Sequence, residues 1–147
     1  GYGIWPLKLA EKATRLNVNS ISCTNAPTQY AAIAALKGPQ DQVKTMVKEF
    51  KERKELIVNM TNNIPGFSCI TPEGAFYTMP NIKKTGLSSK EMETLLLEKL
   101  YVASVAGTSF GSYGEGYIRF SYANSKENIK KALNRIHDYA IENNWNS

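Results

Sequence analysis

Cysteine and histidine are scarce in this sequence: its 147 residues include only Cys23, Cys69 and a single histidine, His137. These three residues cannot form a zinc site, so no metal centre is expected. The two cysteines lie far apart in the chain, and we expect buried free thiols. No carboxylate or serine is placed by the sequence to recruit His137, which favours a surface or hydrogen-bonded role over catalysis.

Long hydrophobic runs are also absent. No apolar run approaches the length of a membrane span, and no charged-then-apolar signal segment opens the chain. The composition, 42% hydrophobic and 21% charged, is typical of a soluble globular protein, so we expect a cytoplasmic protein without a membrane partner. The net charge of +5 is mild and the lysines are spread along expected helices, so no nucleic-acid partner is expected.

Apolar residues at helical spacing predict five helices, at about 6–16, 27–37, 41–62, 88–100 and 125–142. We interpret the longest as a link between two regions, with a stripe of core residues made of Val43, Met46, Val47, Phe50, Ile57, Met60 and Ile64. Ser88 with Glu91 forms a capping-box pattern, and Ser125 suits the N-cap of the last helix. The polar stretch 17–25 is expected to be a connection.

Strand-like segments follow the longest helix, at 67–70, 75–80, 102–106 and 117–122, and a further short strand is expected at 1–5. The first two are expected to form a hairpin around a turn at 71–74. From residue 67 the order is strand, strand, helix, strand, strand, helix. This order predicts an α/β fold, with an α+β small domain in which helices pack on one face of a small, mostly antiparallel sheet.

Arg119 is the clearest candidate for a binding residue. The last strand has one apolar face, made of Ile118, Phe120 and Tyr122, and Arg119 lies on the other face. A guanidinium is a planar, charged fork that can hold a carboxylate or phosphate by two parallel hydrogen bonds. The glycine-rich loop before it lacks a P-loop lysine and the spacing of a dinucleotide fingerprint. The alternative is a surface or salt-bridged arginine after a loop whose glycines only turn the chain.

Three segments resemble, in order, motifs of the C-terminal part of class I and II, fold-type I pyridoxal-phosphate-dependent aminotransferases, the aspartate aminotransferase group. GYGIWP at 1–6 is similar to the return strand after the family's lysine and phosphate-binding arginine. TPEGAFYTMPNI at 71–82 resembles the P-x-G-A-F-Y hairpin, and VASVAGTSFGSYGEGYIRFSYA at 102–123 resembles the segment in which a strand-borne arginine precedes S-Y-A. The resemblance covers essentially the whole chain.

The resemblance implies an enzyme that moves an amino group between an amino acid and a 2-oxo acid. Arg119 would grip the α-carboxylate of the substrate, and Gly107, Thr108 and Ser109 would line the pocket edge. Thr24 and Asn25 would lie at the interface of a homodimer. Residues 1–38 would be a remnant of the large cofactor-binding domain, and 39–147 the small domain with its linking helix.

The resemblance also implies what this chain lacks. The family's Schiff-base lysine lies upstream of the opening motif, as do the phosphate-binding arginine and the aspartate that pairs the pyridine nitrogen. We therefore expect a fragment that has no catalytic residue of its own, binds no pyridoxal phosphate and is inactive alone. The stretch 17–25 contains no arginine, so specificity for dicarboxylates is neither supported nor excluded.

Two alternatives stay open at this point. One is another fold-type I pyridoxal-phosphate enzyme, such as a decarboxylase, lyase or synthase, in which a carboxylate-binding arginine can take the same place. The other is an RNA-binding α/β module, because GEGYIRFSY at 114–122 faintly resembles the aromatic strand that stacks bases. Phe120 and Tyr122 share the face of Ile118, which favours the core over base stacking.

Overall fold

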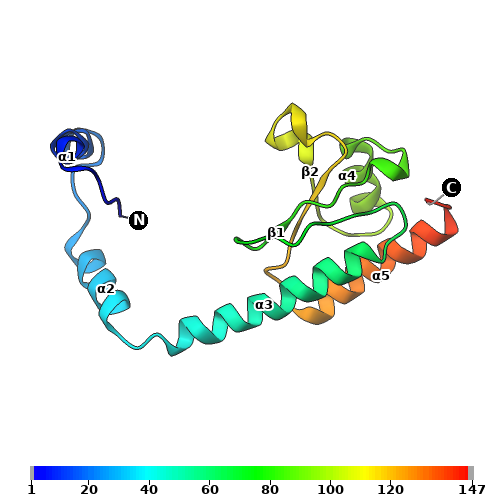
Figure 1. Ribbon diagram of the computed structural model, residues 1–147, viewed down its shortest axis with the longest axis horizontal. Helices are drawn as coiled ribbons and strands as arrows, with labels where there is room; N and C mark the ends of the chain where they lie inside the picture. The colour runs from blue at the N-terminus through cyan, green and yellow to red at the C-terminus, as the bar shows by residue number, and fades with distance from the viewer. Residues whose placement is uncertain (1, 146–147) are drawn as a thin grey trace. The chain divides into compact units, whose positions relative to one another are not determined.

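The computed structural model describes residues 2–145 and divides the chain into two compact units, Gly1–Gln42 and Val43–Ser147. The first unit contains α1 (Leu7–Ile21) and α2 (Ala26–Lys37), and α3 (Asp41–Asn62) leads into the second unit (Figure 1). This division describes compactness alone. The assignment of residues 1–38 to a cofactor-binding domain stays a prediction.

In the first unit, α1 is longer than the sequence pattern predicted. The helix continues through polar residues to Ile21, and the Asn19 amide donates to the Arg15 carbonyl oxygen at 2.7 Å. No proline or glycine interrupts this stretch, so the helix does not end where its apolar pattern does. The connection expected at 17–25 is therefore shorter. It leaves the thiol of Cys23 exposed, and the expectation of a buried thiol is wrong there.

The strand expected at residues 1–5 is not formed. Gly1 lies outside the described residues, and residues 2–5 form no β-pair with any other described segment. An extended segment becomes a strand only when a neighbouring strand binds its main chain, which explains the difference. α2 forms as expected around Pro27, with the Asn25 side chain accepting a hydrogen bond from Thr28 N–H as N-cap.

The second unit is built on a three-stranded antiparallel sheet in the order β1-β3-β2. β1 (Tyr77–Thr78) pairs with one edge of β3 (Ile118–Ser121), and β2 (Val105–Ala106) pairs with the other edge. The described helices of this unit are α3, η1 (Lys83–Thr85), α4 (Ser89–Glu98), η2 (Gly107–Phe110), η3 (Ser112–Gly114) and α5 (Lys126–Glu142). α3 and α5 lie side by side (Figure 1), and the predicted α/β class is confirmed.

The hairpin predicted for 67–70 and 75–80 is wrong in its pairing. One isolated bridge joins Ser68 to Asn81, which follows the second segment directly, and β1 within that segment pairs with β3 instead. The side chain of Asn62 in α3 binds the main chain that a hairpin partner would have bound. Its Oδ1 accepts from Cys69 N–H at 2.7 Å, and its Nδ2 donates to the Cys69 carbonyl at 3.0 Å.

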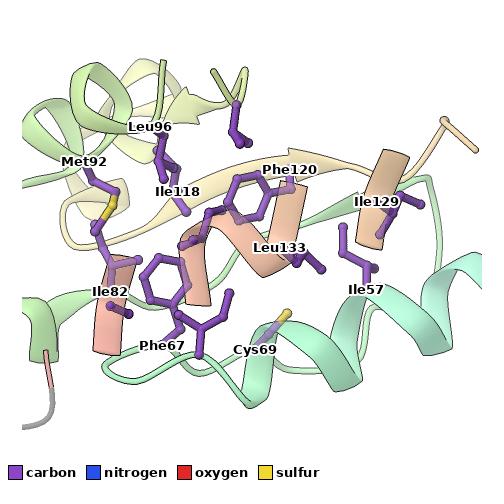
Figure 2. Close-up of a cluster of buried hydrophobic side chains, with 14 of the residues drawn as sticks. Ile57, Phe67, Cys69, Ile82, Met92, Leu96, Ile118, Phe120, Ile129 and Leu133 are labelled. Atoms are coloured by element: carbon purple, nitrogen blue, oxygen red, sulfur yellow. The ribbon is translucent and has the colours of Figure 1, made fainter. Parts of the chain in front are cut away.

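One hydrophobic cluster joins the sheet to the helices of the second unit (Figure 2). Its buried members include Ile57 of α3, Met92 and Leu96 of α4, Ile118 and Phe120 of β3, and Ile129 and Leu133 of α5. Cys69 joins them, so its thiol is buried as predicted. The stripe predicted for α3 is only partly core, because Val43, Met46 and Val47 are exposed. These residues precede Phe50, where packing against the cluster begins.

Candidate functional site

Arg119 lies in the middle of the sheet, on β3, opposite Val105 of β2. The burial alternates along the strand as predicted: Ile118 and Phe120 are buried, Arg119 is half-buried and Ser121 is exposed. Burial of the apolar face fixes the orientation of the strand, because successive side chains point to opposite faces. The Arg119 side chain therefore leaves the sheet on the face away from the core.

Two aromatic rings flank the Arg119 guanidinium. Its Cζ lies 4.4 Å from the ring centroid of Tyr77 and 4.7 Å from that of Phe110. Tyr77 belongs to β1, on one side of β3, whereas Phe110 ends η2, which follows β2 on the other side. A cation over an aromatic face is attracted by the ring quadrupole. The two rings thus hold the charged group between the neighbouring strands.

The guanidinium has no carboxylate partner within residues 2–145, where the ion pairs involve other side chains. The alternative of a salt-bridged arginine is therefore not supported. A guanidinium carries five N–H donors and no acceptor. With no acidic partner among the described residues and with an aromatic ring on each side, Arg119 can offer these donors to an anion.

The predicted pocket edge, Gly107, Thr108 and Ser109, forms η2 directly before Phe110. Gly107 is buried and its N–H donates to the Tyr117 carbonyl at 2.9 Å, whereas Thr108 and Ser109 are exposed. The turn of η2 places Phe110 on the guanidinium. That these three residues line a substrate pocket stays a prediction.

Ser89, which sequence reasoning missed, binds the segment that enters β3. Its fully buried side-chain oxygen accepts from the N–H groups of Gly116 and Tyr117 at 2.9 and 3.2 Å and donates to the Gly114 carbonyl at 3.2 Å. Ser89 begins α4, so the helix and the strand entry are tied together. The signal in the sequence was that Ser89 is a second serine directly after Ser88. The capping pattern explains Ser88 and gives no role to Ser89.

Glu93, one turn further along α4, ties the other end of the loop. Its carboxylate accepts from Ala106 N–H at 3.0 Å and pairs with Lys90. The Lys90 hydrogen bond first, and the Ala106 N–H second, lower the pKa of Glu93 below its ordinary value. The predicted capping box is confirmed, since Ser88 and Glu91 each accept the main-chain N–H of the other. Hydrogen bonds from Ser88 lower the pKa of Glu91.

The other reactive side chains do not converge on Arg119. Burial raises the pKa of the Cys69 thiol, which therefore stays protonated and weakly nucleophilic. His137 is half-exposed and contacts Asp138 at 3.2 Å. Among residues 2–145, no group of three His, Cys, Asp or Glu is placed to hold a metal ion, and no helix has the length and apolar character of a membrane span.

The predicted interface residues, Thr24 and Asn25, lie at the start of α2 in the first unit. Both are exposed. The Thr24 carbonyl accepts from the Gln29 side chain at 2.8 Å, and Asn25 is the N-cap of the helix. Their polar groups thus organise the start of α2, and their place at a subunit interface stays a prediction.

A hollow of about 460 Å³ opens elsewhere in the second unit, between the end of β3 and α5. Its lining includes Tyr101, Asn124, Lys131 and Arg135 but not Arg119. The guanidinium between its two rings, rather than this hollow, is the feature with a defined chemistry.

The arrangement of helices and strands in this chain matches that of solved aminotransferases. The aromatic aminotransferase from Pyrococcus horikoshii OT3 matches it with a TM-score of 0.87 at 35% identity, over 95% of this chain and 38% of that chain. The aspartate aminotransferase from Rhizobium meliloti matches with a TM-score of 0.83 at 34% identity, over 92% and 36%.

The chain belongs to the family described as Aminotransferase class I and II, whose model matches residues 1–136. Its relatives include an aspartate aminotransferase from Pyrococcus horikoshii, 41% identical over 138 residues, which are 92% of this chain. Aromatic-amino-acid aminotransferase 2 from Thermococcus litoralis is 37% identical over 138 residues. The chain spans about 35% of the length of these curated relatives.

Proposed function

We propose that this chain is the C-terminal part of a pyridoxal-phosphate-dependent aminotransferase that moves an amino group between an amino acid and a 2-oxo acid. Within it, Arg119 holds the α-carboxylate of the substrate. Family membership supports the reaction class, and two named relatives, an aspartate and an aromatic-amino-acid aminotransferase, act on different amino acids by their names. The proposal therefore names the group that Arg119 binds and leaves the side chain of the substrate open.

The observation that carries this proposal is the environment of Arg119. The guanidinium is fixed on a central strand, lies over two rings and has no acidic partner among the described residues. A carboxylate is the planar, two-oxygen partner that fits such a fork. Holding the carboxylate fixes one end of the substrate, and catalysis gains from orientation of this kind.

The cofactor itself is not anchored by this part of the chain. Pyridoxal phosphate, when bound, supplies the electron sink of transamination. Burial is one of the two main ways to lower the pKa of an anchoring amine, beside a neighbouring cation, and no lysine of residues 2–145 is buried. We therefore propose that the chain alone binds no pyridoxal phosphate and is for that reason inactive. Gel filtration of the isolated chain with pyridoxal phosphate tests this, because a cofactor absorbance that stays with the protein would contradict it.

The role of Arg119 is tested by Arg119→Lys and Arg119→Gln in the longer protein that contains this chain. Loss of two charge-assisted hydrogen bonds is expected to weaken amino-acid binding about 100-fold in Arg119→Gln, which corresponds to about 3 kcal/mol. Arg119→Lys keeps the charge but not the fork, so a smaller loss is expected. The measurement is equilibrium binding of the amino acid by calorimetry.

Arg135→Gln is the matched control. Arg135 is an exposed arginine of α5, and its guanidinium donates to the Leu100 carbonyl. Its amino-acid affinity is expected to stay within about twofold of the parent, since surface substitutions have small effects. Unchanged affinity in both Arg119 variants would overturn the role of Arg119.

The runner-up is another fold-type I pyridoxal-phosphate enzyme, such as a decarboxylase, lyase or synthase, in which Arg119 would hold the same carboxylate. Product analysis separates them: transfer of the amino group to a 2-oxo acid supports the aminotransferase, whereas release of CO₂ supports a decarboxylase.

No observation favours RNA binding, because Phe120 and Tyr122 are buried at 5% and 2% exposure and cannot stack on bases.

We further propose that the longer protein that contains this chain forms a homodimer. Sedimentation of that protein tests this proposal.

A further inference from the structure

We propose that Tyr77 and Phe110 form an aromatic pair that restricts Arg119 to planar carboxylates, and that Phe110 is a specificity-determining residue. This inference rests on the proposed role of Arg119 and adds the reason for its selectivity. The ligand class is a carboxylate whose two oxygens lie in the plane of the guanidinium. Tetrahedral anions, such as a phosphonate, are the class it rejects.

The aromatic pair reaches Arg119 from two different strands. In the ladder of β1 and β3, Tyr77 lies opposite Ser121, which places its ring on the same face of the sheet as Arg119, one diagonal step away. On the other side, β2 lies opposite Arg119 at Val105 and leads directly into η2, which ends at Phe110. The guanidinium therefore lies between rings that come from both sides of its strand.

The rings constrain the direction from which an anion can approach. The guanidinium carbon lies over each ring, and the two rings come from opposite sides of β3, so they fill the space on two sides of the group and leave an anion the remaining directions. The face of an aromatic ring carries negative potential. Both oxygens of a carboxylate can lie in the guanidinium plane, between the rings. A tetrahedral PO₃ group always places an oxygen out of this plane, so it needs more room beside the two rings.

Phe110 is the more informative member of the aromatic pair. Phe110 is 56% exposed and is not part of the buried cluster, so removal of its ring leaves the hydrophobic core intact. The loop that carries it is fixed at both ends by α4, through Glu93 at Ala106 and Ser89 at Gly116. These hydrogen bonds hold the Phe110 ring over the guanidinium, although the ring is not packed into the core. Tyr77 is half-buried and packs against Phe76 at 4.5 Å between ring centroids. Its replacement would therefore disturb more than the contact with Arg119.

The test compares two ligands in the longer protein: an amino acid that it binds, and the 1-aminoalkylphosphonate with the same side chain. The variants are Phe110→Leu, which removes the ring, and Phe110→Tyr, which keeps it. Tyr113→Leu is the matched control, because Tyr113 belongs to the same loop, is 99% exposed and lacks the ring contact with Arg119. Calorimetry gives both dissociation constants, and their ratio measures the selectivity.

The parent protein is expected to bind the carboxylate at least about tenfold more tightly than the phosphonate. Phe110→Leu is expected to weaken carboxylate binding by about 3–10-fold, in line with loss of one cation–π contact, and to bring the ratio near one. Phe110→Tyr and Tyr113→Leu are expected to keep the parent ratio. A general loosening of the loop would change both dissociation constants by the same factor, so the ratio isolates the effect of the ring.

The inference is overturned if the parent protein binds the carboxylate and the phosphonate equally well. It is also overturned if Phe110→Leu keeps the ratio of dissociation constants of the parent while Arg119→Gln still weakens carboxylate binding. In the second case the proposed role of Arg119 survives. If Arg119→Gln leaves carboxylate binding unchanged, the proposed function fails as well. The two failures are therefore distinct.

Discussion

Gly107 and Gly114 approach each other so closely that neither position has room for a side chain. A Cβ atom on Gly107 would lie 2.2 Å from the Gly114 carbonyl oxygen, and one on Gly114 would lie 2.0 Å from the Gly107 carbonyl oxygen. Both obstacles are main-chain atoms, which cannot move aside as a flexible side chain could. This contact closes the base of the loop that carries Phe110.

Gly114→Ala is therefore expected to destabilise the chain by about 3 kcal/mol, because the added methyl forces the loop apart. Urea unfolding measures the change. Gly74→Ala is the control, since a Cβ at Gly74 would meet no atom within 4 Å, and its effect is expected to stay within about 0.5 kcal/mol. Equal stabilities of the two variants would contradict the contact.

Ser89→Ala is expected to destabilise the chain by about 1–3 kcal/mol. The substitution removes the three hydrogen bonds of the buried hydroxyl, with Gly116 N–H, Tyr117 N–H and the Gly114 carbonyl, and each is worth about 1 kcal/mol. Ser109→Ala serves as the comparison, because Ser109 is an exposed serine of the same loop. Thermal unfolding of both variants tests the prediction, which fails if the two melting temperatures fall equally.

Glu93 is expected to make stability depend on pH in the acid range. Its pKa in the folded chain is lowered, so its contribution is present above its ordinary value near 4.5 and is lost as pH falls through the folded pKa. Glu93→Gln cannot titrate, so its unfolding free energy is expected to fall less steeply than that of the parent below pH 4.5. Urea unfolding at pH values between about 3 and 7 gives both slopes. Identical slopes would show that Glu93 is not the group responsible.

Thr61→Val is expected to leave stability unchanged or to raise it by about 1 kcal/mol. The Thr61 hydroxyl is fully buried in α3 and has no hydrogen-bond partner among the described residues. Valine has the same shape without the unpaired polar atom, so desolvation of the hydroxyl is avoided. Thr94→Val, at an exposed position of α4, is expected to bring no such gain. A loss of more than about 1 kcal/mol in Thr61→Val would reveal a partner for the hydroxyl.

Local patterns in the sequence predicted the features that depend on near neighbours. The alternation at Ile118 to Ser121 identified the exposed face of Arg119, and the spacing of Ser88 and Glu91 identified the start of α4. Both rest on contacts within a few residues, which strand and helix geometry determine.

Contacts between distant residues escaped prediction. Ser89 binds Gly116, 27 residues further along, and Tyr77 meets Arg119 across strands that are not consecutive in the chain. The predicted hairpin was wrong for the same reason, because the Asn62 side chain satisfied Cys69 from another element. Periodicity describes which face of a segment is apolar, and it does not identify the partner of that face.

The central place of β3 in the sheet limits how Arg119 can move. Hydrogen bonds to β1 and β2 hold the strand along both edges, and its apolar face is packed into the core. A shift of the strand alone would break two ladders at once, whereas a shift of the whole second unit would break neither. If substrate binding draws Arg119 inward, the motion must be a hinge movement of the entire unit, and the amide hydrogens of β3 should exchange equally slowly with and without substrate.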